Sequence, residues 1–325
     1  MPDTLLSRRA GVVSMALVGT LLAGCAGPTL QYPEVITEQE EATTLPGAVE
    51  LTETPFFPDE TYYCGPAALA TVLVSSGVET RASSLVDAVY LPERQGSLQN
   101  ELVAAARRAD RVPFEISADL GALFEEVAAG HPVLILQNLG LEALPHWHYA
   151  VLVGYDKEEE TVTLRSGTER RETLSMRRFE RTWVRAERWA IVVPGPGNLP
   201  ASATPGDWVA AVAELERQER WSAALDGYRA ALARWPEHPD AWLGVGNVQY
   251  GQEEYSEAVD AYREAVEHDP SLAAAHHNLA WALLRLDREA EALEAARRSE
   301  ELAPEHPRYG EAVQQIRQEA SLALP

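Results

Sequence analysis

The chain has 325 residues, of which 46% are hydrophobic and 24% charged, so it can bury a core and is long enough for two domains. Acidic residues number 50 and basic residues 27, and the net charge of −23 argues against binding to a nucleic-acid backbone. Two cysteines exclude a disulfide-stapled fold and a cysteine-rich zinc module, and we expect neither a cofactor nor a metal.

The first 25 residues have the form of an export signal. Arg8 and Arg9 precede an apolar run over residues 11–24, which is too short to span a bilayer comfortably. The run ends in Leu-Ala-Gly-Cys25, which resembles the lipobox of bacterial lipoproteins, in which the cysteine is acylated. We therefore predict a signal peptide over residues 1–24 and a lipid anchor on Cys25. The alternative is an ordinary signal peptide with a chance cysteine.

Residues 25–54 are rich in Pro, Thr and Glu, which predicts a flexible tether behind the acylated cysteine. Ala26 follows Cys25 in place of Asp, and by resemblance to known sorting this favours the outer membrane. We expect an exported lipoprotein of the cell envelope on the periplasmic face of that membrane.

Residues 55–194 have the pattern of an α+β domain. Helical periodicity or helix start and stop residues occur at 64–77, 97–108 and 119–128. Apolar runs of strand length follow at 132–137, 147–155, 161–164, 171–174 and 189–193. Helices come first and strands later, which predicts N-terminal helices packed on a mostly antiparallel sheet.

Cys64 stands at or just before the first helix of this domain. Backbone N–H groups and the helix dipole stabilise a thiolate at such a position, so we expect a lowered pKa for the Cys64 thiol. Cys64 is the only cysteine left once Cys25 is acylated, and an unpaired thiol is a liability in an oxidising compartment. It is either a buried small hydrophobe or the nucleophile of a catalytic site.

A thiol nucleophile needs a base, and His148 is the best candidate. Five of the eight histidines lie in the C-terminal repeats, and His131 precedes a strand. His148 opens the apolar run HYAVLVGYD, from which it can face a helix terminus. His146 shares its strand face by period two, but Pro145 places His146 nearer a loop. Either histidine alone is better explained as a surface or satisfied core residue; it is the pairing with Cys64 that favours catalysis.

The C-terminal third repeats itself every 34 residues. The spacing holds for three sets of residues: Trp208 and Trp242; Ala224, Ala258 and Ala292; Pro236, Pro270 and Pro304. The pattern resembles the tetratricopeptide repeat, and it predicts an all-α domain of three repeats plus a capping helix over residues 207–325. A Pro/Gly/Ser-rich stretch over 195–206 is the expected linker. Such repeats form a groove that can hold a peptide or protein partner.

The segments CGPAALATVL and HYAVLVGYD, with Gly-Ser-Leu at 96–98, resemble the papain-like cysteine peptidases that process double-glycine leader peptides. The order of parts in this chain also resembles a family of predicted bacterial cysteine peptidases. Its members combine a lipoprotein signal, this peptidase domain and tetratricopeptide repeats. The resemblance implies Cys64 as nucleophile and His148 as general base.

Two positions depart from that family's pattern. Asp59 stands near the place of a glutamine that donates to the oxyanion, and a carboxylate cannot donate unless it is protonated. Gln137 and Asn138 are possible substitutes, together with the backbone N–H of Cys64. Ser166 is the expected occupant of the third, histidine-orienting position, where the family usually has Asp or Asn; Asp156 is nearer in sequence but closes a strand.

The sequence therefore predicts a membrane-anchored cysteine peptidase that acts on a peptide or protein substrate, with the repeats recruiting that substrate or a partner. The competing hypothesis is a peptidase-like domain that binds peptides with little or no cleavage and serves as an envelope scaffold. A transferase or amidase with the same thiol mechanism is a third alternative.

Overall fold

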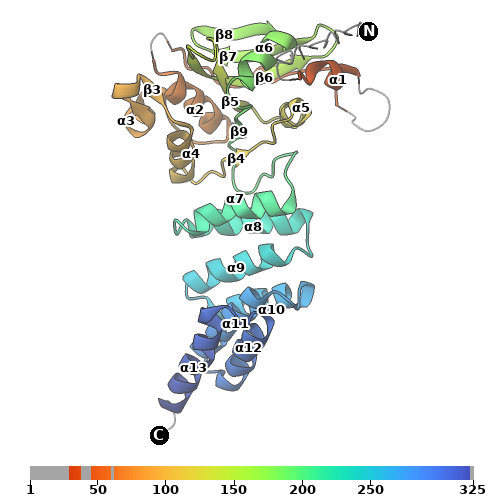
Figure 1. The fold of residues 1–325 in the computed structure, drawn as a ribbon. Helices are drawn as coiled ribbons and strands as arrows, with labels where there is room; N and C mark the ends of the chain where they lie inside the picture. The colour runs from red at the N-terminus through yellow and green to blue at the C-terminus, as the bar shows by residue number, and fades with distance from the viewer. Residues whose placement is uncertain (1–28, 38–44, 60–61, 323–325) are drawn as a thin grey trace, which may run out of the picture.

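The structure, a computed structural model, describes residues 29–37, 45–59 and 62–322. The predicted signal peptide and Cys25, the predicted lipid attachment site, lie outside these residues. The described part forms an α+β domain followed by an array of helices, as predicted (Figure 1). Within it, no helix is both long and apolar enough to cross a bilayer.

A seven-stranded antiparallel sheet is the centre of the first domain. Its strands run in the order β4-β9-β5-β6-β7-β8, and β1 also pairs with β6. The bounds are β1 (Ala48–Glu50), β4 (Phe114–Glu115), β5 (Val133–Asn138), β6 (Trp147–Asp156), β7 (Thr161–Ser166), β8 (Glu169–Ser175) and β9 (Ala190–Val192). A separate hairpin pairs β2 (Tyr90–Leu91) with β3 (Gly96–Ser97). The five predicted strands correspond to β5 to β9.

Helices cover the two faces of this sheet. On one face α2 (Cys64–Ser75) packs with α4 (Gln99–Arg108) against Leu134, Leu136 and Val151, while α3 (Ala82–Val89) lies beside α2. On the other face α5 (Leu120–Ala128) and α6 (Met176–Val184) cover Ile135 and Leu152. Both α5 and α6 begin with a side-chain N-cap. Asp119 accepts a hydrogen bond from the N–H of Ala122, and Ser175 accepts one from the N–H of Arg178. Successive side chains along the strands therefore pack alternately against the helices on one face and on the other.

The segment predicted as a flexible tether is partly folded, which corrects that expectation. Helix α1 (Tyr32–Thr37) packs against α5 and α6, and β1 extends the sheet by pairing with β6. Leu45, Val49 and Leu51 join the core, so burial of these apolar side chains holds the segment in place.

Seven helices form the C-terminal array, and six of them make three antiparallel pairs that agree with the predicted repeats. Their bounds are α7 (Pro205–Glu216), α8 (Trp221–Arg234), α9 (Pro239–Gly251), α10 (Tyr255–His268), α11 (Ala273–Arg285), α12 (Glu289–Leu302) and α13 (Pro307–Leu322). Small residues let these helices approach closely: a Cβ on Gly244 or Gly246 would overlap the ring of Tyr228 or Tyr262. Helix α13 covers the end of the array (Figure 1).

The two domains share one core. Trp208 of α7 is fully buried with its ring centroid 6.3 Å from that of Phe114 in β4. The connecting stretch is packed as well, because the carboxylate of Glu126 accepts from both the N–H and the hydroxyl of Ser202, at 2.8 and 2.6 Å. Arg220, the residue before α8, adds an ion pair to Asp110 at 3.0 Å. The repeats are thus fixed to the sheet domain.

Candidate active site

Cys64 is the first residue of α2, and the helix behind it is buried from Gly65 to Leu73. Pro66 fits the first turn, where a missing N–H costs nothing. The thiol is half-buried and is not part of a disulfide. Its Sγ lies within reach of three backbone N–H groups, those of Tyr149, Gly65 and Cys64 itself.

The pKa of the Cys64 thiol is raised, which is the reverse of the expectation from its helix N-terminus. Burial is the largest cause, and the charge of Asp59 adds to it. The backbone N–H groups act in the opposite direction but do not overcome the burial. The resting sulfur is therefore a neutral thiol at pH 7.

His148 lies near the start of β6, and Ser166 ends the neighbouring strand β7. His148 Nε2 is 3.0 Å from Ser166 Oγ, so this nitrogen is engaged and Nδ1 is left for proton transfer. Burial lowers the pKa of His148, partly offset by the charges of Glu172 and Asp59. The imidazole is therefore neutral at pH 7 and able to accept a proton.

Cys64 begins α2 and His148 lies near the start of β6, and the charge of Asp59 acts on both groups. The Sγ atom is within reach of the N–H of Tyr149, the residue that follows His148. No hydrogen bond joins this sulfur to the imidazole in the part of the chain that the structure describes. The resting arrangement is a neutral thiol next to a strand that carries a neutral base, not an ion pair.

Asp59 lies at the same site. Its backbone N–H donates to the carbonyl of Gly167 at 2.9 Å, and its carboxylate accepts from the N–H of Tyr63 at 3.1 Å. Its negative charge raises the pKa of both Cys64 and His148. The carboxylate therefore lies close enough for its charge to act on both the thiol and the imidazole.

A narrow pocket lies between α2, β7 and the segment before α2. Phe56, Asp59, Cys64, Tyr149 and Ser166 are among the residues that line it. Its volume of about 10 Å³ is room for about one water molecule, which is too small to enclose a peptide side chain.

Three other sequence candidates do not reach the sulfur. Gln137 belongs to the opposite face of the sheet, where its amide donates to the hydroxyl of Thr182 in α6. Asn138 Oδ1 accepts from the N–H groups of Gly140 and His146 and so fixes the loop after β5. Asp156 caps the turn after β6. Among the proposed oxyanion donors, the N–H of Cys64 is the one placed at the site.

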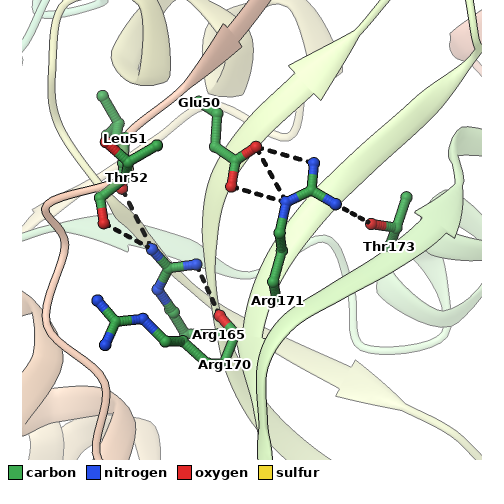
Figure 2. A network of polar contacts seen from close by, with 7 residues as sticks. All are labelled: Glu50, Leu51, Thr52, Arg165, Arg170, Arg171 and Thr173. Carbon is green, nitrogen blue, oxygen red and sulfur yellow. Dashed lines mark hydrogen bonds and ion pairs between the residues drawn. The ribbon is translucent and has the colours of Figure 1, made fainter.

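Arg165 is a positioning residue that the sequence analysis missed. Its side chain is buried in β7 and donates to the carbonyls of Leu51, Thr52 and Arg170 (Figure 2), and also to that of Thr54. These bonds fix the segment that leads to Asp59. An arginine inside the apolar strand sequence TVTLRS was the available signal, because a buried cation needs several acceptors.

Comparison with known proteins agrees with both parts of the fold. Residues 44–191 match the Peptidase C39-like family, and residues 210–273 and 246–307 match the tetratricopeptide repeat. The first domain is therefore a C39-like peptidase domain, and the second is a tetratricopeptide repeat domain. A comparison with curated proteins returned no match.

Three solved structures are each similar to part of this chain. A C39-like peptidase from Bacillus anthracis is 19% identical over 45% of this chain and 96% of that one, with a TM-score of 0.39. The TPR2B domain of yeast Sti1 in a pHsp70 complex is 20% identical over 36% and 96%, with a TM-score of 0.34. The type III secretion translocator chaperone SycD of Yersinia enterocolitica is 18% identical over 37% and 90%, with a TM-score of 0.33.

Proposed function

We propose that the protein is a cysteine peptidase in which Cys64 is the nucleophile and His148 the general base. The observation that supports this most directly is the position of the Cys64 sulfur, at a helix N-terminus and beside the strand residue that follows His148. The match of residues 44–191 to a peptidase family agrees with it.

The proposed reaction starts from the neutral pair. Nδ1 of His148 takes the thiol proton while Sγ bonds to the peptide carbonyl carbon, and the N–H of Cys64 donates to the oxyanion. The C–N bond then breaks, and the imidazolium returns the proton to the leaving amine. Water, activated by the same imidazole, releases the acid and restores the thiol. Ser166 holds the ring through Nε2 during these steps.

The repeats have the role of recruiting a substrate or a protein partner. Their fold matches a repeat family, and a regular array of this kind offers an extended surface for peptides. We also propose that the protein is an exported lipoprotein of the envelope, anchored through acylated Cys25 at the periplasmic face of the outer membrane. The signal-like segment before Cys25 supports this part.

A second function is favoured by the chemistry around the sulfur. The negative charge of Asp59 would repel a developing oxyanion, and burial keeps Cys64 protonated. In addition, Ser166 stabilises an imidazolium less than a carboxylate would. A domain with these features can bind peptides while cutting them slowly or not at all, and would then act as an interaction scaffold.

The two functions are separated by comparing envelope peptides, by mass spectrometry, from cells that carry the native protein, Cys64→Ser or the exposed control Ser83→Ala. A peptidase predicts products that disappear with Cys64→Ser and persist with Ser83→Ala. Identical peptides in all three strains, with partners still co-purifying, would favour the scaffold. Cys25→Ser tests the anchor separately, since it should move the protein from the membrane fraction to the soluble fraction.

A further inference from the structure

The first described residues are fixed against α6. The carboxylate of Glu180 accepts from the N–H groups of Gln31 and Tyr32 at 2.6 and 3.0 Å, and Arg188 donates to the carbonyl of Thr29 at 2.9 Å. Only residues 26–28 separate Thr29 from Cys25 in the sequence. Because a residue spans at most about 3.6 Å, a lipid on Cys25 would keep Thr29, and so the surface beside the end of α6, within about 15 Å of the membrane.

The outer face of α6 is basic, although the whole chain carries a charge of −23. Its exposed residues are Arg177, Arg178 and Arg181, whereas the one acidic residue of the helix, Glu180, is fully buried. Figure 1 places α6 on the side of the peptidase domain that is far from the repeats. This face is suited to a negatively charged surface.

An apolar hairpin adjoins the same helix. The loop between β5 and β6 exposes 73% of Leu141 and 78% of Leu144, and Trp147 at the start of β6 is 52% exposed. Arg185, just past the end of α6, donates to the carbonyl of Asn138 at 2.8 Å and so ties the base of the hairpin to the helix. The arginine face, the hairpin and the N-terminal exit are therefore contiguous.

The exposed apolar side chains are concentrated around the candidate site. Among the described residues, the large hydrophobic ones that are exposed occur in three short segments: Tyr62 and Tyr63, Leu98, and the hairpin with Leu139, Leu141, Leu144 and Trp147. None lies in the repeats. Apolar and aromatic side chains next to arginines are the composition of a surface that enters the membrane interface.

We infer that α6 and the β5–β6 hairpin form a docking face for a bilayer that contains anionic phospholipids. The arginines contact the headgroups, and Leu141, Leu144 and Trp147 enter the interfacial layer. Because Trp147 directly precedes His148, docking sets the mouth of the catalytic site at the bilayer surface, where it meets membrane-proximal peptides. The orientation rests on the proposed anchor at Cys25, but lipid binding by this face requires neither acylation nor peptidase activity.

Vesicle binding of the unacylated chain tests the docking face by itself. The chain from residue 25 onward with Cys25→Ser retains every described residue, and it is sedimented with neutral phosphatidylcholine vesicles or with vesicles that also contain phosphatidylglycerol. We expect binding to the anionic vesicles that weakens with salt. Changing Arg177, Arg178 and Arg181 to Gln should lower it by about fivefold per arginine. The matched control changes three exposed repeat arginines, Arg229, Arg297 and Arg317, to Gln and should leave binding unchanged.

Insertion of the hairpin is tested with lipids brominated on their acyl chains, which quench nearby tryptophans. Trp147 is the one exposed tryptophan of the eight, so quenching should occur in the parent chain and disappear in Trp147→Phe. Leu141→Ser with Leu144→Ser should reduce it several-fold. Equal binding of the two triple-arginine variants, or quenching that survives Trp147→Phe, would overturn the inference. The inference would also be overturned if the chain bound no vesicles and the variant with Leu141→Ser and Leu144→Ser lost cleavage of a soluble peptide or lost self-association.

Discussion

At the residue scale, the sequence pointed to Cys64, His148 and Ser166 as candidates, but it did not give the protonation of the first two. Cys64 and His148 were identified from their places at the start of a helix and of a strand, and Ser166 from the strand that follows. The helix N-terminus suggested a thiolate, whereas the structure has a raised pKa because burial outweighs the backbone N–H groups. How deeply a side chain is buried depends on distant packing, so a local pattern could not supply it.

The pH dependence of Cys64 alkylation follows from that raised pKa. Only the thiolate reacts, so the rate constant with iodoacetamide should rise about tenfold per pH unit from pH 6 to 9 without a plateau. The ring of His148, with its lowered pKa, stays neutral over most of this range and gives no separate step near its usual 6.5. A rate constant that is flat from pH 6 to 9 would reveal a resting thiolate–imidazolium pair and contradict the neutral pair.

Asp59→Gln should make the site a better peptidase. The change removes a charge that raises the pKa of Cys64 and supplies an amide donor near the oxyanion. We expect kcat/KM on a cleaved peptide to increase by about tenfold, since one oxyanion donor is worth at least that much. Glu53→Gln, in the same segment but exposed, is the control and should have no effect. A loss of activity in Asp59→Gln would instead assign the carboxylate an essential role.

At the element scale, the regular strands were predictable and the short or boundary elements were not. Runs such as residues 132–137 and 147–155 have the length and apolar content of buried strands, and β5 and β6 match them within one residue. Helix α6 was missed because arginines between its buried side chains, Met176, Phe179 and Trp183, make the mean hydropathy of the segment polar. Strand β1 has three residues and exists through its pairing with β6, which no local signal encodes.

Arg165 links these elements, and its replacement tests how the site is held. Arg165→Met leaves four backbone carbonyls without their charged donor, so we expect the free energy of unfolding to fall by about 3 kcal/mol. Arg171 is the matched control: it is exposed in the neighbouring strand and pairs with Glu50 at 2.9 Å (Figure 2). Arg171→Met should have a much smaller effect, because an exposed ion pair adds little. Urea unfolding measures both, and equal losses would contradict the role given to Arg165.

At the scale of the whole molecule, the repeat period was sufficient to predict the second domain but not its attachment. A spacing of 34 residues fixes helix pairs that stack on one another, because each pair buries its apolar face on the next. The Pro/Gly-rich stretch over 195–206 suggested a simple linker. In the structure Ser202 is bonded to Glu126, and Trp208 packs near Phe114, so the junction is part of a shared core.

Trp208→Ala should therefore weaken the peptidase domain as well as the repeats. Removing this buried ring leaves a cavity at the junction, with an expected loss of about 4 kcal/mol. In a chain with Cys25→Ser, alkylation of Cys64 in increasing urea reports unfolding of the peptidase domain alone. The midpoint should shift to lower urea in Trp208→Ala. The equivalent residue of the next repeat provides the control, and a shift as large in Trp242→Ala would rule out a special role for the junction.

The catalytic pair is tested most directly by the rate at which a peptidyl chloromethyl ketone modifies Cys64 at pH 7, in the native chain and in His148→Ala. Such a reagent places its electrophilic carbon as a substrate does, so its reaction needs the base as well as the sulfur. The native chain should react at Cys64 at least a hundredfold faster than His148→Ala. Equal rates in the two proteins would contradict a catalytic Cys64–His148 pair.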